Sequence, residues 1–212
     1  MEIQFDESKH EYYCDGKRVP SVTEILSPIT AGGYSKINPV VLEHAAMKGT
    51  MVHEWCEMYD YGCADESVPS ELAPYCKAYA DFIRDYRPKW EKIEEIVAYY
   101  TLDEYGEKII HYAGRLDRMG LIDGWKSIVD IKTISTPSTK THISVCCQTA
   151  AYAKAIECYE HAERYALYLK PDGTYKVFDC REYEEKHDFS GLDVFYNLLS
   201  LKMEIERIGK KK

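Results

Sequence analysis

Two acidic residues and a lysine, placed on neighbouring extended segments, constrain this chain more than any other feature. Asp117 lies in the sequence Gly-Arg-Leu-Asp-Arg, and residues 127–133 form an apolar run, Ser-Ile-Val-Asp-Ile-Lys-Thr, that is typical of a strand. Because side chains alternate along a strand, Asp130 and Lys132 point to the same face. An Asp-Gly turn signal at residues 123–124 separates the two segments. We therefore expect a hairpin that sets Asp117 beside Asp130.

This arrangement indicates a metal site. Two neighbouring carboxylates repel each other unless a cation lies between them. Carboxylate oxygens favour a hard ion, so we expect Mg²⁺ or Mn²⁺. Lys132, on the same strand face as Asp130, is placed to orient or deprotonate a water molecule held by that ion.

Composition narrows the class of protein. The 212 residues, with nineteen tyrosines and no membrane-length apolar run, predict one globular domain and no membrane association. The first residues lack the pattern of a signal peptide, so we expect a cytoplasmic protein. Eight cysteines form no Cys-x-x-Cys pair, which favours free thiols over a zinc ribbon. The net charge of −9 argues against a non-specific nucleic-acid coat protein but is compatible with a nuclease.

Periodicity and turn signals predict a mixed α/β fold. We expect a hairpin over residues 2–19, in which Asp15-Gly16 forms the turn, and a capping box at residues 21–24 that opens a short helix. Further helices are expected at residues 38–61, 70–86, 141–159 and 192–208, and strands at 93–102, 108–119, 127–133, 164–170 and 175–180.

Several motifs, in order, resemble one known family. Residues 20–26 read Pro-Ser-Val-Thr-Glu-Ile-Leu, and residues 49–53 read Gly-Thr-Met-Val-His. Asp117 and the Asp-x-Lys of residues 130–132 follow, and then Gln-x-x-x-Tyr at residues 148–152. This set is similar to the PD-(D/E)xK nuclease superfamily, and within it to the RecB-like exonuclease branch, especially its phage-encoded members.

The resemblance implies a restriction-endonuclease-like core, a mixed central sheet flanked by helices. It implies one nuclease domain over residues 1–212: an N-terminal hairpin and helical part (1–90), a catalytic sheet and helix (91–180) and a C-terminal helix (181–212). The implied activity is metal-dependent hydrolysis of DNA phosphodiester bonds by a phage-derived exonuclease acting in recombination or DNA processing. A phage recombination partner protein and a homo-oligomer are further expectations.

The resemblance also assigns roles to residues of this chain. His53, Asp117, Asp130 and the backbone carbonyl of Ile131 would be metal ligands, and Lys132 would position the attacking water. Gln148 and Tyr152, four residues apart and so on one helix face, would support the site. The sequence His-Glu-x-x-Glu from His53 departs from the His-Glu-x-x-His of zinc peptidases.

Some points stay open at this stage. The family often carries a glutamate on the preceding strand, where Glu94 and Glu95 are both candidates, with spacing favouring Glu94. Arg115 and Arg118, which flank Asp117, fit either phosphate binding or ordinary ion pairing. The last cysteine is Cys180, so we expect no iron–sulfur cluster, and without a phosphate-binding loop we expect no ATP.

Two alternative functions remain. A nuclease-fold protein that binds DNA or a partner without cleavage would fit the acidic net charge. A metal-dependent hydrolase of another substrate would fit the same fold, because fold alone does not determine substrate.

Overall fold

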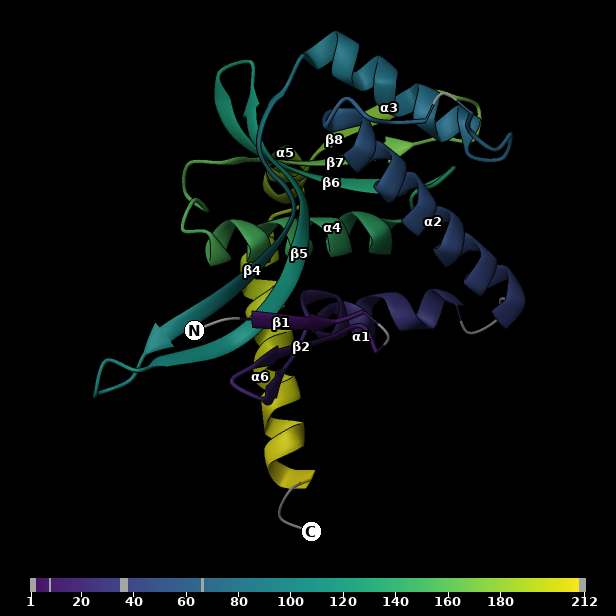
Figure 1. Cartoon of the computed structure of the whole chain (residues 1–212). Helices are drawn as coiled ribbons and strands as arrows, with labels where there is room; N and C mark the ends of the chain where they lie inside the picture. The colour runs from purple at the N-terminus through teal and green to yellow at the C-terminus, as the bar shows by residue number, and fades with distance from the viewer. Residues whose placement is uncertain (1–2, 8, 35–37, 66, 210–212) are drawn as a thin grey trace.

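The computed structural model of the chain describes residues 3–7, 9–34, 38–65 and 67–209. Over these residues the fold is mixed α/β, as the sequence predicts (Figure 1). The elements are β1 (Ile3–Asp6), β2 (Glu11–Cys14), β3 (Lys17–Val19), α1 (Val22–Tyr34), α2 (Pro39–Asp60), α3 (Ala73–Tyr86), β4 (Lys89–Leu102), β5 (Lys108–Ile122), β6 (Trp125–Thr133), α4 (Thr139–Ala155), β7 (Glu163–Leu169), β8 (Tyr175–Asp179), α5 (Cys180–Lys186) and α6 (Gly191–Gly209).

A five-stranded sheet with the order β4-β5-β6-β7-β8 is the centre of the molecule. Its strand pairs are antiparallel except β6–β7, which are parallel and are joined through α4. The β5–β6 hairpin forms as expected, and both turn residues, Asp123 and Gly124, have positive φ angles of 51° and 84°. An Asp-Gly pair suits this two-residue turn because both residues tolerate that backbone conformation.

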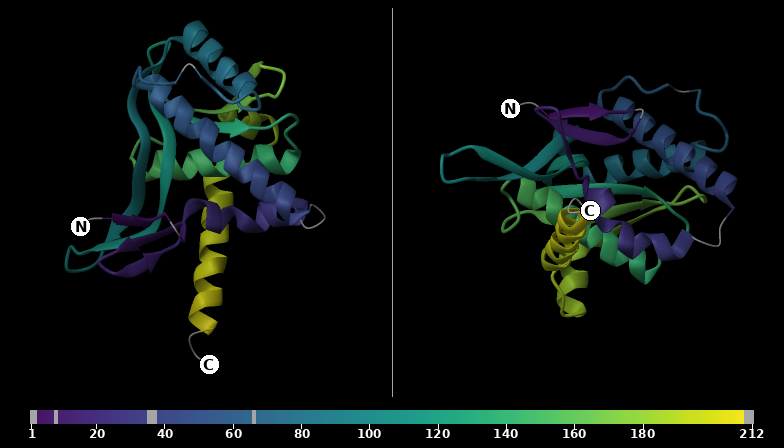
Figure 2. Two further views of the ribbon diagram at one scale, coloured as in Figure 1. Left: turned by 45° about the vertical axis from the view of Figure 1, so that its right-hand side comes forward. Right: turned by 90° about the horizontal axis from the view of Figure 1, so that it is seen from below.

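Helices cover both faces of this sheet. Residues of α1, α4 and α6 pack with β4–β6 in one apolar cluster, and residues of α2 and α3 pack with β5–β8 in another. The outer half of α6 projects from the body (Figure 2). The sheet is therefore buried on both sides, and polar side chains at its centre are held in an environment of low dielectric constant.

Helix starts follow local signals. Asn38 Oδ1 accepts a hydrogen bond from Val40 N, and Pro39 occupies the first helical position of α2. At α1 the predicted capping box is only half formed. Ser21 Oγ accepts from Glu24 N at 3.0 Å, but the Glu24 carboxylate pairs with Arg18 and Lys202.

Three expectations about elements need correction. The N-terminal segment forms a three-stranded sheet because the chain before Glu11 adds β1 as a further strand. The helix expected at residues 141–159 spans Thr139–Ala155, because a capping box of Ser138 and Thr141 starts it earlier. Helix α5 was not predicted; Asp179 caps it by accepting from Glu182 N.

No helix in the described ranges combines the length and the apolar character needed to cross a bilayer. All eight cysteines are free thiols.

Strands β4 and β5 approach closely at Gly120. A Cβ atom at this position would overlap the carbonyl oxygen of Lys89 and would lie 2.7 Å from Trp90 Cα. We predict that Gly120→Ala lowers the free energy of unfolding by about 1–3 kcal/mol, measured as a lower urea midpoint. Gly209→Ala, whose added Cβ meets no neighbour, is the control and should be neutral or slightly stabilising. Equal midpoints for Gly120→Ala and wild type would contradict this close contact.

Candidate metal centre

Asp117 lies where the regular pairing of β5 with β6 ends. The last paired residues are Arg118 and Val129. One step further, Asp117 Oδ2 accepts a hydrogen bond from the backbone nitrogen of Ile131 at 2.6 Å. A side chain therefore replaces a backbone group in the ladder, and the carboxylate is held in a buried position.

Glu94 faces Asp117 across the β4–β5 pair. Ile93 pairs with Arg118, and Glu95 pairs with Leu116, so Glu94 lies between these two pairs. Its φ angle is +48°, a left-handed conformation that is rare for a glutamate within a strand. Such strain persists only where the surroundings hold it, and it is concentrated at functional sites. Here Arg118 Nη1 donates to Glu94 Oε1 at 2.9 Å.

His53 reaches the same point from α2, on the opposite side of the site. Its Nε2 atom is 3.0 Å from the carbonyl oxygen of Ile131. Its Nδ1 atom is 3.5 Å from Glu94 Oε1 and 3.8 Å from Asp117 Oδ2. One potential ligand atom from each of His53, Glu94 and Asp117 lies within 4.8 Å of the other two. These three residues form the candidate metal centre.

The donor set fits a divalent cation. Two carboxylates and one imidazole converge, and the Ile131 carbonyl oxygen adjoins the imidazole. Oxygen donors suit Mg²⁺ and Mn²⁺, and neutral imidazole is a common ligand of transition metals, so Mn²⁺ suits the mixed set well. The sequence left Glu94 and Glu95 open; Glu94 points into the centre, whereas Glu95 pairs with Lys92.

Burial and the charges of neighbouring groups shift the pKa values of all three residues of the centre. Burial raises the pKa of Asp117 to about 6, and the Asp130 and Glu94 charges act in the same direction. Burial acts to lower the pKa of His53, but Asp117 and Glu94 outweigh it and hold that pKa above its ordinary value. The pKa of Glu94 is lowered: burial opposes this, and the hydrogen bond with His53 and the charge of Arg118 outweigh burial.

Asp130 and Lys132 form an adjoining ion pair on β6. Asp130 is buried, and Lys132 Nζ lies 2.9 Å from its Oδ1 atom and 2.8 Å from its Oδ2 atom. The expected neighbours Asp117 and Asp130 are thus close enough to interact electrostatically. The compact three-residue cluster, however, contains Glu94 and not Asp130, whose carboxylate engages Lys132.

Gln148 and Tyr152 lie side by side on α4, as their spacing predicts. Gln148 Nε2 donates to Tyr152 OH at 3.3 Å, and both side chains are buried. Burial and the charges of Asp117 and Asp130 raise the pKa of Tyr152 well above its ordinary value, so the phenol stays protonated. Gly114 makes room for this ring, since a Cβ there would lie 2.8 Å from Tyr152 Cε1.

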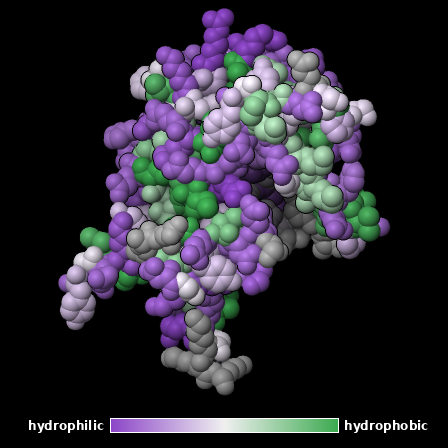
Figure 3. All heavy atoms as spheres, in the orientation of Figure 1, coloured by the Kyte–Doolittle hydropathy of each residue, from purple (hydrophilic) through white to green (hydrophobic). Residues whose placement is uncertain are grey.

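Two cavities meet at His53. One, of about 350 Å³, is lined by acidic and aromatic groups together with Arg115; the other, of about 520 Å³, is lined by Lys132, Lys140 and several hydroxyl side chains. Both include His53 and Gly49 of α2. The face in Figure 3 is mainly hydrophilic and is hollowed between α2 and the β4–β5 pair. His53 therefore borders both cavities, whereas Glu94 and Asp117 line only the smaller one.

The sequence did not identify the residues that support the centre. Arg118, left open between phosphate binding and ion pairing, is fully buried, with Nε 2.6 Å from Asp60 Oδ2. Tyr79 OH donates to the same Asp60 oxygen at 2.6 Å. An acidic residue at the end of a helix and a tyrosine in the next helix carry no sequence signal for this contact. Arg115, in contrast, lines a cavity of the site.

Comparisons with known proteins add little here. No protein-family model matches the sequence, and no curated protein is significantly similar to it. Among solved structures, the chain is similar to SSO0001, with a TM-score of 0.45 and 12% sequence identity over 92% of this chain and 79% of that chain. A similarity at this level supports no argument about the site.

Metal binding should stabilise the fold through Glu94. We predict that saturating Mn²⁺ raises the melting temperature of the wild type by several degrees, because a ligand that binds only the folded state stabilises it. Glu94→Gln should lose most of this increase, whereas Glu95→Gln, changed at the neighbouring residue, should retain it. Equal Mn²⁺ shifts in the two variants, measured by scanning calorimetry, would exclude Glu94 as a ligand.

Without metal, Asp117 should destabilise the fold at neutral pH. Its pKa in the folded state, about 6, exceeds its ordinary value of 3.8, so the cost is absent below about pH 4, grows between pH 4 and 6, and is complete above that. In EDTA, Asp117→Asn should therefore raise the free energy of unfolding by roughly 1–3 kcal/mol at pH 8 and leave it unchanged at pH 4. Urea titrations measure both values, with Asp103→Asn in the β4–β5 turn as control.

Proposed function

We propose that this chain is a divalent-metal-dependent nuclease that hydrolyses DNA phosphodiester bonds. The observation that carries the proposal is the convergence of His53, Glu94 and Asp117 from α2, β4 and β5, beside the Asp130–Lys132 pair of β6. These groups come from distant parts of the chain, and a cation gives their crowding a physical reason. The ordered motifs described above extend the proposal to exonucleolytic action in DNA recombination or processing.

The residues of the candidate metal centre would bind the cation and hold its ligands in place. His53, Glu94 and Asp117 would hold the cation, with the Ile131 carbonyl and Asp130 adjoining. When bound, a divalent cation supplies charge that neutralises the phosphate and favours ionisation of a water molecule. The chain's own contribution is to hold these donors rigidly, since Asp117 and Glu94 are each tied by a hydrogen bond to a neighbouring group.

Lys132 and Tyr152 would act on the substrate directly. The Lys132 ammonium is positioned by Asp130; about a third of the Lys132 side chain is exposed, and the residue lines the larger cavity. It can donate hydrogen bonds to a phosphate oxygen or to the attacking water as negative charge develops. The protonated phenol of Tyr152, which lines the smaller cavity, offers a neutral donor on the other side.

The two cavities favour a polymeric substrate over a small phosphate ester. They share His53 and Gly49, so the centre lies between two openings of different character. Lys140 and hydroxyl groups in the larger cavity suit a phosphate backbone, whereas the smaller cavity offers Tyr12 and Tyr152. A chain substrate can extend from the centre in both directions.

Cleavage assays test the proposal. The wild type should degrade linear DNA with Mg²⁺ or Mn²⁺ and not with EDTA, and an exonuclease should spare closed circular DNA. Lys132→Ala should reduce the rate by about 10²–10³-fold, because it removes a donor aimed at developing charge. The matched control is Lys126→Ala. Lys126 is on the same strand but outside the site, with its Nζ atom 4.0 Å from Glu91 Oε2.

Two outcomes would overturn the assignment. One is a wild type that leaves every DNA substrate intact, and the other is undiminished cleavage by Lys132→Ala. Retention of DNA without products, unchanged by Asp130→Asn, would instead support the alternative of a non-cleaving DNA-binding protein.

A further inference from the structure

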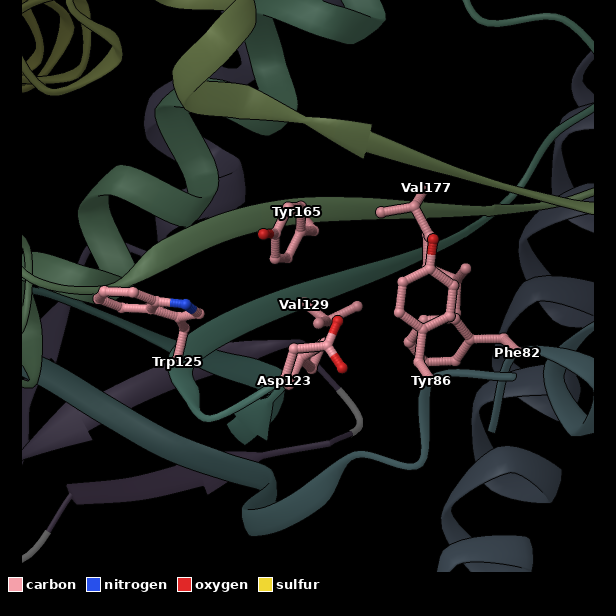
Figure 4. Close-up of a pocket in the computed structure, with 9 residues that line it drawn as sticks. Phe82, Tyr86, Asp123, Trp125, Val129, Tyr165 and Val177 are labelled. Atoms are coloured by element: carbon pink, nitrogen blue, oxygen red, sulfur yellow. The ribbon is translucent and has the colours of Figure 1, made fainter. Parts of the chain in front are cut away.

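A third cavity, of about 210 Å³, lies on the α3 side of the sheet and has a lining unlike that of the candidate metal centre (Figure 4). Aromatic side chains surround it: Tyr86 and Phe82 from α3, Trp125 from the start of β6 and Tyr165 from β7. Asp123, in the β5–β6 turn, adds the one carboxylate, and Val129 lies between these groups in the close-up. We call this cavity the aromatic pocket.

Among the groups that line the aromatic pocket, the side chains of Asp123, Trp125 and Tyr165 are not engaged elsewhere in the described part of the chain, whereas Tyr86 packs against Phe82 and Tyr175. Within the described ranges, no hydrogen bond or ion pair involves the Asp123 carboxylate, and neither Trp125 nor Tyr165 stacks on another ring. The cation–ring contacts of the described residues fall on other rings. Trp125 is 66% exposed. A carboxylate and open ring faces around one cavity are complementary to a positive charge.

The surroundings of the pocket are also acidic. Burial raises the pKa of Tyr165 to about 12, and the charges of Asp179, Glu163 and Asp123 add to the effect. The negative charge of Glu163 is partly balanced by Arg181, whose Nη1 atom lies 3.6 Å from Glu163 Oε1. Lys126 is next to Trp125 in the sequence, but its Nζ atom lies 4.0 Å from Glu91 Oε2. An anionic ligand is therefore disfavoured. A neutral apolar ligand would cover Asp123 without compensating its charge.

We propose that the aromatic pocket binds an alkylated ammonium group, with the rings of Trp125, Tyr165 and Tyr86 around it and the Asp123 carboxylate as its counter-charge. The size supports a head group and not a larger molecule, since pockets for drug-sized ligands measure about 300–1,000 Å³. The small number of polar groups in the pocket favours an ammonium group whose hydrogens are replaced by alkyl groups. A guanidinium carries five N–H donors and a primary ammonium three, and one carboxylate cannot satisfy them, whereas alkyl groups replace donors with apolar surface.

Choline and its neutral isostere 3,3-dimethyl-1-butanol provide the test. Each is titrated with the full chain, and the methyl proton resonance is followed by NMR, because ring currents shift methyl groups that enter the pocket upfield. Choline should bind saturably, with a dissociation constant of about 1 mM, and the isostere should bind at least about threefold more weakly. A peptide with one trimethyl-lysine is the third probe. Tighter binding of the peptide identifies a protein side chain as the ligand, and tighter binding of choline identifies a small molecule.

The variants separate binding from folding. Asp123→Asn should weaken choline binding about three- to fivefold, and it should preserve the turn because asparagine accepts the same positive φ. Asp15→Asn makes the same change in another Asp-Gly turn, where Asp15 also has a positive φ, of 49°, and should leave binding unchanged. Equal binding of choline and the isostere, equal binding by Asp123→Asn and wild type, or the absence of saturable choline binding would each overturn the proposal.

Discussion

The candidate metal centre depends on the contacts of one buried cation, the guanidinium of Arg118. Taking a charge out of water costs several kcal/mol unless partners surround it, and removing one partner leaves the others uncompensated. Arg118 meets this requirement by bonding Asp60 of α2 and Glu94 of β4, while its Nη1 also donates to the Asp117 carbonyl oxygen at 2.7 Å. It thereby fixes the distance between the helical layer that carries His53 and the strands that carry the carboxylates.

The strained backbone at Glu94 follows from this contact. In a regular strand Glu94 would alternate with Ile93 and Glu95, and its side chain would be set by the pleat alone. A φ of +48° breaks that alternation. The cost of a left-handed glutamate, of order 1–3 kcal/mol, is tolerated because Arg118 and His53 both engage the carboxylate that the distortion delivers. Local strain and buried charge are thus parts of one arrangement.

This coupling also explains how far the sequence could lead. The strand–turn–strand unit from Asp117 to Lys132 was predictable because turn chemistry and strand alternation act over a few residues. The shared helix face of Gln148 and Tyr152 follows from helical spacing alone. Spacing favoured Glu94 over Glu95, but strand alternation could not decide between them, since the direction of the Glu94 side chain depends on a backbone distortion stabilised by Arg118. The burial of Arg118 in turn depends on Asp60, 58 residues earlier in the chain, and no periodicity encodes such a contact.

The charge balance of the candidate metal centre would favour a doubly charged ion. Four carboxylates surround two permanent cations; they belong to Asp60, Glu94, Asp117 and Asp130, and the cations are Arg118 and Lys132. Without metal, proton binding relieves only part of this excess: the pKa values of His53 and Asp117 are both raised, but Asp117, with a pKa of about 6, is largely ionised at neutral pH. A protonated imidazole cannot act as a ligand. A divalent ion would bring two positive charges to these carboxylates, so its binding would relieve their mutual repulsion.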